Sequence, residues 1–283
     1  LEDEVGMRLF DRGLRYVQLT PVGKRVQLRA QRLLSSSHDL ERELRLLKSG
    51  DLGNISLGGG PFSGHVVLPR TIAQLHHQHP SVQVSIVIDH WAQQLQNLHA
   101  ETIDFFTGDI RELEGEPSLL IEPIGVLYGA VFCRTDHPLA SRDIVSAADI
   151  AAYGMASVHL PSEVEKSMRA MTKNPRDLGL PISFQCEDLL LSRELVLQTD
   201  ALLIAPHMSV QHELMSGQMK ELVVQELESL GNKTPLQTPL GTVRMAERTL
   251  SPAADILLEI IAKTGAELLK PPLPLIEMGR FRS

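Results

Sequence analysis

The chain has 283 residues, and its 43% hydrophobic and 22% charged residues are ordinary for a globular protein with one or two cores. The longest apolar runs are too short to span a bilayer, and no basic-then-apolar leader opens the chain, which favours a cytoplasmic protein over a membrane or exported one. The net charge of −8 is unevenly distributed along the chain, since residues 1–50 carry ten Lys and Arg against seven Asp and Glu. This distribution suggests that only this segment binds a polyanion.

The first twenty residues predict a short helix followed by a small β-ribbon. Leu1 to Val5 has the composition of a helix interior, and this helix is expected to end over residues 9–12. Gly13 begins a turn with Arg15 near its tip, and Val17 and Leu19 would complete the ribbon, or wing. The chain starts with Leu in what reads as mid-helix, so we expect it to be cut at this end.

This segment carries a resemblance to a known family. The run is Leu1-Glu2-Asp3-Glu4-Val5-Gly6-Met7-Arg8-Leu9-Phe10-Asp11-Arg12, followed by Val17-Gln18-Leu19-Thr20-Pro21-Val22-Gly23. It resembles the end of the winged helix-turn-helix of LysR-type transcriptional regulators, in which "LE..lG..LF.R" and "LT.aG" precede a long linker helix. The resemblance implies that residues 1–20 are the C-terminal remnant of that domain, with most of the recognition helix upstream of Leu1.

A basic cluster in this segment is the expected DNA contact. Seven basic residues and one acidic residue lie between Arg8 and Arg32. We expect salt-dependent, sequence-indifferent contact with DNA phosphates through Arg12, Arg15, Lys24 and Arg25. A basic helix face that is merely solvated remains the alternative.

Residues 21–50 predict a long helix that pairs with a second copy of the chain. Thr20 followed by Pro21 is a start signal, and Gly50 is a stop signal. Hydrophobic residues recur at heptad spacing, so the expected dimerisation residues are Val26, Leu33, Leu40, Leu44 and Leu47. The stripe favours a homodimer or homotetramer, although a seam this short also fits a helix packed on its own domain.

From residue 54 the pattern alternates between strands and helices, which predicts parallel pairing with short crossovers. The strands are expected at 54–57, 82–88, 103–107, 119–124, 126–133, 155–158, 182–186, 201–205 and 242–245. The helices are expected at 63–79, 91–99, 163–173, 189–198 and 252–269.

The alternation occurs twice, and the two sets are separated by the turn His137-Pro138-Leu139-Ala140, which matches one in the LysR family. The resemblance continues to about Leu269 and implies an α/β, two-lobed, periplasmic-binding-protein-like effector domain. Lobe I is expected at 51–129 and 233–270, lobe II at 130–232, and a flexible tail at 271–283. The segment 198–206 lacks both glycines that the family usually has there.

A small-molecule effector is expected where the predicted strands end, since ligands of open α/β sheets bind there. The glycines at 58–60 lack the spacing of a nucleotide motif, but they lead into a helix whose first amides can receive an anion or carbonyl. Carried over by position from the family, the effector-binding residues are Gly60, Pro61, Phe62, Ser63, Trp91, Ser157, His159 and Glu187. A plain capped helix and a tryptophan packed in the core remain the simpler readings.

No other motif in the sequence is specific enough to predict a metal site or a catalytic site. His76, His77 and His79 resemble a metal tract, but no carboxylate or cysteine completes a ligand set, and Cys133 and Cys186 have no CxxC spacing. Neither GxSxG nor HExxH occurs, so we expect no catalytic residue, metal or cofactor apart from a small-molecule co-inducer. The chain is therefore interpreted as a DNA-binding transcriptional regulator under allosteric control, with a solute-binding protein of the same fold as the alternative.

Overall fold

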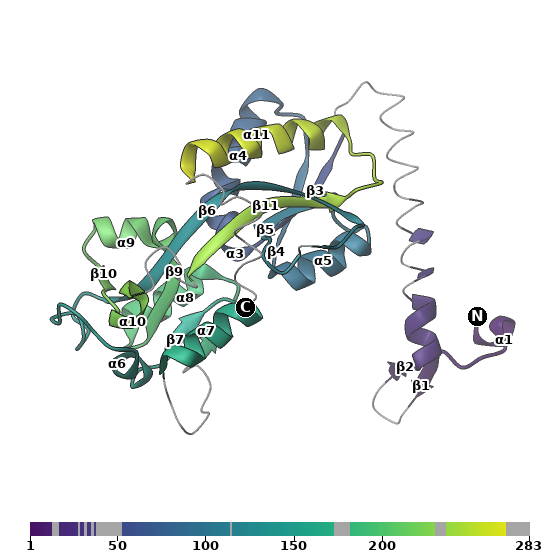
Figure 1. The fold of residues 1–283 in the computed structure, drawn as a ribbon. Coiled ribbons are helices and arrows are strands. Elements are labelled where there is room, and N and C mark those ends of the chain that lie inside the picture. The colour runs from purple at the N-terminus through teal and green to yellow at the C-terminus, as the bar shows by residue number, and fades with distance from the viewer. Residues whose placement is uncertain are drawn as a thin grey trace.

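The computed structural model describes residues 1–12, 17–27, 29–30, 33–34, 37, 53–113, 115–172, 182–229 and 236–269 (Figure 1). Arg15, Leu40, Leu44, Leu47 and the tail 271–283 lie outside these residues, as does the side chain of Arg12. None of the described helices is both long enough and apolar enough to cross a membrane.

The N-terminal segment is a short helix and a β-hairpin. Helix α1 (Glu2–Val5) ends at Gly6, whose φ of 68° is left-handed, and strands β1 (Phe10–Arg12) and β2 (Val17–Leu19) pair antiparallel. The predicted ribbon is confirmed. The prediction that the helix runs on to residues 9–12 was wrong, because the left-handed glycine stops it and Phe10 already pairs with Leu19.

Hydrogen bonds explain the sequence motif of this segment. The Glu2 carboxylate accepts from the amides of Leu9 at 2.6 Å and Phe10 at 2.9 Å, which ties α1 to the hairpin. The Thr20 hydroxyl accepts from the Gly23 amide at 2.9 Å, as expected of a helix cap. A Cβ on Gly23 would lie 2.0 Å from the Leu9 carbonyl oxygen, so only glycine fits against the hairpin.

Helical structure follows directly at residues 21–27 and is also present at 29–30, 33–34 and 37. In the single chain the side chains of Leu33 and Leu34 are 73% and 62% exposed, while Val26 is half-buried. Exposure of leucines on this scale is what a partner helix would remove.

The remaining strands form one mixed sheet. Among the described residues its order is β4-β3-β5-β11-β6-β9-β7-β8, with β10 paired beside β6. The strands are β3 (Ile55–Gly59), β4 (Val84–Ile88), β5 (Phe105–Asp109), β6 (Leu119–Arg134), β7 (Met155–Ser157), β8 (Ile182–Gln185), β9 (Leu202–Pro206), β10 (Met219–Leu222) and β11 (Gln237–Met245).

Parallel pairing holds at the two ends of this sheet only. β3 pairs parallel with β4 and β5, and β7 pairs parallel with β8 and β9, as predicted. The pairs of β11 with β5 and β6, and of β6 with β9 and β10, are antiparallel, so the prediction was wrong there. The sequence pattern shows where strands lie but not which distant strand each one meets.

Strand β6 runs through both halves of the molecule. Its residues up to Tyr128 pair with β11, and from Gly129 on it pairs with β9. The predicted break at Gly125 is absent: β6 continues, and a register shift opposite Leu240 and Gly241 makes Ile124 an extra, bulged residue. We call the part with β3, β4 and β5 lobe I and the part with β7 to β10 lobe II.

Helices cover the sheet in both lobes (Figure 1). They are α3 (Pro61–Val66), α4 (Leu68–Gln78), α5 (Trp91–His99), α6 (Ala147–Ala151), α7 (Ser162–Thr172), α8 (Leu189–Gln198), α9 (Gln211–Met215), α10 (Gln225–Glu228) and α11 (Pro252–Leu268), with a 3-10 turn η1 (His207–Val210). The predicted single helix 63–79 is two helices that meet at Val67. Pro69 has no amide hydrogen, so the series of helical hydrogen bonds is interrupted there.

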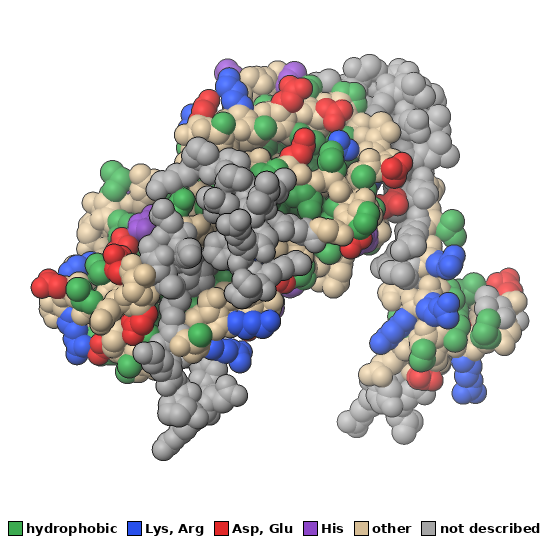
Figure 2. All heavy atoms as spheres, in the orientation of Figure 1, with side chains coloured by type: hydrophobic (Ala, Val, Ile, Leu, Met, Phe, Trp, Pro, Cys, Tyr) green, Lys and Arg blue, Asp and Glu red, His purple; other side chains and the backbone are tan. Residues whose placement is uncertain are grey.

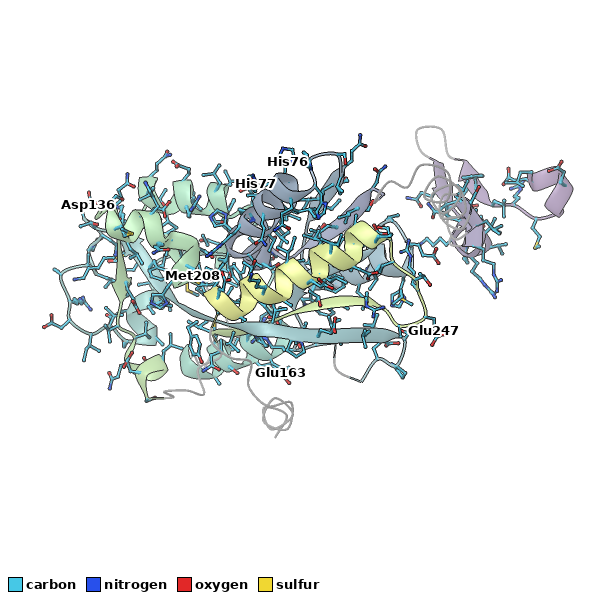
Figure 3. All side chains as sticks on the ribbon, turned by 90° about the horizontal axis from the view of Figure 1, so that it is seen from above. His76, His77, Asp136, Glu163, Met208 and Glu247 are labelled. Carbon is cyan, nitrogen blue, oxygen red and sulfur yellow. The ribbon has the colours of Figure 1, made fainter. Side chains whose placement is uncertain are left out.

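The cores of the two lobes are separate apolar clusters. In lobe I, α4 and α11 lie side by side over the sheet and bury Leu75, Leu257 and Ile261 against Phe105 (Figures 1 and 3). In lobe II, side chains of β7, β9 and α7 pack together around Met155. Burial of each such side chain contributes about 1.5–3 kcal/mol to folding.

We expect Gly265→Ala to destabilise the fold by about 1–2 kcal/mol, although alanine is the better helix former. A Cβ on Gly265 of α11 would lie 2.7 Å from the carbonyl oxygen of Ile124, a backbone atom of β6 that has little room to move. Thermal or urea unfolding measures the change. Ala262→Gly, at an exposed position of α11, is the control for helix propensity alone. A Gly265→Ala protein more stable than the parent would show that the helix can shift away from β6.

Candidate functional site

A cavity with about 640 Å³ of empty space, part of it open to solvent, lies between the two lobes. Lobe I contributes the segments that follow β3, β4 and β5, and lobe II contributes the segment after β7, the start of α7 and the end of β9. The crossing strands β6 and β11 supply the floor through Gly129, Thr238 and Leu240. The position is the edge at which parallel strands end, where ligands of open α/β sheets bind.

Six of the eight residues expected from the sequence line this cavity. They are Gly60, Pro61, Phe62, Ser63, Trp91 and His159. Four of them belong to the turn into α3, which begins with Pro61 and leaves its first-turn amides without intrahelical partners. The other two lie at the start of α5 and after β7.

Ser63 is held in place by the sheet. Its side chain is fully buried, and the hydroxyl lies 2.7 Å from the Thr107 carbonyl oxygen and 3.2 Å from that of Gly60. A hydroxyl has one hydrogen to donate, so the bond to Thr107 leaves Ser63 to act as an acceptor. A donor to a ligand at this turn is therefore more readily supplied by the first-turn amides of α3 than by the Ser63 hydroxyl.

Trp91 faces both the core and the cavity. It is half-buried at the first position of α5 and packs against the cluster that contains Leu98 and Phe106. Its indole Nε1 is buried and has no hydrogen-bond partner among the described residues. An unpaired buried donor costs folding free energy, and Trp91 is one of the residues that line the cavity.

Ser157 and Glu187 do not line the cavity. Ser157 is fully buried in β7, and its hydroxyl has no hydrogen-bond partner among the described residues. Glu187 lies behind His159 and accepts from its backbone amide at 2.8 Å. Burial raises the pKa of the Glu187 carboxyl above its ordinary value, although the bond from His159 acts in the opposite direction.

An ion pair that the sequence did not suggest lies on the lobe I wall. The Arg111 guanidinium donates to both carboxylate oxygens of Asp109, from Nε at 3.1 and 3.0 Å and from Nη2 at 2.6 Å. Both side chains are largely buried. Asp109 is the last residue of β5, so its place at a strand end was the signal that could have marked it.

Beside the cavity, the described residues make two contacts that join the lobes. The ring of His90, the residue before α5, stacks on that of His159 with 4.6 Å between centroids. Glu112 of lobe I accepts from the amide and the hydroxyl of Ser162, the first residue of α7, at 2.6 and 2.8 Å. Neither His90 nor Glu112 was expected from the sequence, because each is defined by a partner in the other lobe.

The histidines at the end of α4 lie away from this site. His76 and His77 are exposed and project from the outer side of α4, and Figure 3 labels both. The described residues contain no group of three or more side chains placed to hold a metal ion.

Comparisons with known proteins agree with this architecture. A family model described as the LysR substrate binding domain matches residues 48–266. The SDS degradation transcriptional activation protein of Pseudomonas sp. (strain ATCC 19151) is 34% identical over 268 residues, which cover 94% of this chain and 85% of that protein. The transcriptional regulator CbbR of Xanthobacter flavus is 22% identical over 99% of this chain and 81% of its own.

Solved structures show the same fold at low identity. A full-length OxyR variant from Pseudomonas aeruginosa superposes with a TM-score of 0.61 at 17% identity, over 96% of this chain and 86% of that one. CbnR in complex with its target DNA gives a TM-score of 0.61 at 17% identity, over 93% and 86% of the two chains.

We expect Glu187→Gln to raise the unfolding temperature at about pH 7 and to leave the unfolding temperature unchanged at about pH 4. Because the folded-state pKa of Glu187 is raised, the folded chain binds a proton more tightly than the unfolded chain does. Stability is therefore lost as the pH rises from the ordinary carboxyl pKa through the raised one. Glutamine removes this cost and keeps an oxygen for the His159 amide.

Thermal unfolding of both proteins across this pH range measures the difference. Glu194→Gln, at an exposed position of α8, is the matched control. If Glu187→Gln lowered stability at neutral pH, the charge of Glu187 would be stabilised by the neighbouring His90 and His159 by more than its burial costs.

Proposed function

The chain belongs to the LysR family of transcriptional regulators, and we propose that a small molecule bound in the cavity between its lobes controls its activity. The observation that carries this proposal is the cavity itself, whose walls come from both lobes and whose floor is formed by the two strands that cross between them. A molecule that contacts both walls binds one relative position of the lobes better than others, and so shifts the population toward it.

The contacts across the cavity supply the element that such a molecule would bias. The stack of His90 on His159 and the bonds from Ser162 to Glu112 favour closure, and each joins side chains rather than continuous backbone. The backbone changes partners at Gly129, whose amide donates to the Leu236 carbonyl at 2.9 Å. We propose this point as the boundary at which lobe I (51–129 and 233–270) meets lobe II (130–232).

We further propose that the regulated genes serve the breakdown of alkyl sulfates. The relative that activates SDS degradation matches 94% of this chain at 34% identity, so its resemblance covers the cavity as well as the N-terminal segment. SDS is an alkyl sulfate, and the mainly apolar lining of the cavity suits a molecule with a hydrocarbon body.

We propose that the N-terminal segment contacts DNA and that the protein acts in the cytoplasm. Lys24 and Arg25 are exposed on the helical residues that follow the hairpin, and Figure 2 shows several basic side chains gathered on this segment. Together with Arg12 and Arg15 they would neutralise phosphates without reading bases.

Leu33→Glu is expected to reduce the oligomeric state of the chain. We propose that residues 21–50 pair with the same helix of a second copy through the heptad positions. In that pairing, Leu33→Glu would bury one negative charge from each helix in the interface. Light scattering measures the mass. Leu34→Glu is the matched control, because Leu34 is also exposed in the single chain but lies off the seam. Equal masses for the parent and the Leu33→Glu protein would mean that the seam is not the interface.

Filling the cavity is expected to abolish the response to the effector without abolishing DNA binding. Leu160 lies on the lobe II wall in the segment between β7 and α7, and Leu160→Trp would place an indole in the cavity. The promoters occupied in its host by the tagged protein, expressed from its own gene, are identified first, and their transcripts are then measured with and without dodecyl sulfate.

The response should be present in the parent and lost in Leu160→Trp, whose promoter occupancy should persist. Ile144→Trp is the control, since Ile144 is 60% exposed in lobe II and does not line the cavity. A full response in Leu160→Trp would place the effector elsewhere.

A further inference from the structure

The polar side chains of the cavity gather at one end. His90, Trp91, Asp109 and Arg111 all belong to the lobe I segments that follow β4 and β5. Lobe II adds His159, but its ring stacks on His90 and so joins the same end. Apart from Ser63 and Thr238, the polar side chains that line the cavity therefore lie at this end.

The lobe II wall is aliphatic. It consists of Val158, Leu160, Pro161, Val164, Ile204 and Ala205, all buried. Leu236 and Leu240 extend it along the segment that enters lobe I. No side chain of this wall other than His159 offers a hydrogen bond, so water is held there poorly and a hydrocarbon chain would gain from burial.

The carboxylate at the polar end is already paired with a guanidinium. Asp109 is the one acidic side chain among the described residues that line the cavity, and both of its oxygens already accept from Arg111. The Trp91 indole Nε1 is a donor without a partner in the described part of the chain. A ligand head that accepts hydrogen bonds and carries negative charge fits donors and a neighbouring guanidinium, whereas a cationic head would find no free carboxylate.

From these observations we propose that the cavity takes an amphiphilic oxyanion, with its head on the Trp91 end of lobe I and its alkyl chain along the aliphatic wall of lobe II. This inference rests on the proposed function of the cavity and names the class and orientation of its ligand. Because head and chain contact different lobes, such a molecule binds best when the lobes are together. An alkyl sulfate has this chemistry, and so does a fatty acid anion.

Ligand series test the two halves of this proposal. The chain is titrated calorimetrically with dodecyl, decyl and octyl sulfate at concentrations below micelle formation, with far-ultraviolet circular dichroism to verify that it stays folded. Each methylene removed should weaken binding about fourfold. Dodecanoate should bind in the same range as dodecyl sulfate, and dodecyltrimethylammonium at least about tenfold more weakly.

Three results of these series would overturn the proposal. If the cation or dodecanol bound as tightly as dodecyl sulfate, the cavity would not require an oxyanion head. If the affinity did not depend on chain length, the alkyl chain would not be bound along the aliphatic wall.

Variants assign the head and the chain to their walls. Trp91→Phe keeps the aromatic body and removes the donor, so dodecyl sulfate should bind about tenfold more weakly while dodecanol is little affected. Val164→Thr changes the aliphatic wall with nearly the same volume, and should weaken dodecyl sulfate more than octyl sulfate. Val196→Thr, equally buried in α8 but outside the cavity, should bind all three sulfates as the parent does.

The outcomes separate this inference from the proposed function. If no oxyanion binds, but other molecules elicit a transcriptional response that Leu160→Trp abolishes, the ligand class is wrong and the function of the cavity stands. If the sulfates bind with the expected dependence on chain and head, yet Leu160→Trp leaves the response intact, the cavity binds amphiphiles but does not control transcription. Unchanged sulfate binding in both Trp91→Phe and Val164→Thr would overturn the orientation.

Discussion

The antiparallel pairing of β6 and β11 is the interaction on which the rest of the structure depends. It extends from Leu119 opposite Met245 to Tyr128 opposite Gln237, and it places β11 between β5 and β6. Without it, the parallel strands of lobe I would have no connection to those of lobe II, since β6 is the strand that continues into pairing with β9 and β10. The pair therefore joins two separate cores and also forms the floor of the cavity between them.

The chemistry of the cavity follows from how each lobe presents its strands. In lobe I, β4 and β5 end at the cavity, so the residues that leave the sheet there are turn residues and helix starts with polar side chains. In lobe II the segment after β7, the end of β9 and the start of α7 line the cavity with aliphatic side chains that also belong to the core of this lobe, among them Leu160, Val164 and Ile204. Trp91, whose buried Nε1 has no hydrogen-bond partner among the described residues, is one of the lobe I residues that line the cavity.

The N-terminal motif is recognisable because its residues meet backbone requirements rather than a ligand. Glu2 accepts from two amides of the hairpin, Gly6 takes a left-handed conformation, and Gly23 lies against a carbonyl that no larger residue could approach. Such residues tolerate few replacements, whereas contacts with DNA or effector change with each target. This is why the motif identified the family although it says nothing about the effector.

The sequence alone determined the elements whose ends are set by local chemistry. α8 was predicted with both of its boundaries, and α11 with its start at the Ser251 cap, because capping side chains and apolar periodicity act within a few residues. The resemblance to the family, together with position after a strand, selected Gly60 to Ser63, Trp91 and His159, which line the cavity, and also Ser157 and Glu187, which do not. Only the tertiary structure decided the antiparallel pairing of β6 and β11, the burial of Ser157, and the meeting of His90 with His159 and of Glu112 with Ser162. Each of these depends on which residues, far apart in the chain, pack together, and no local pattern records that choice.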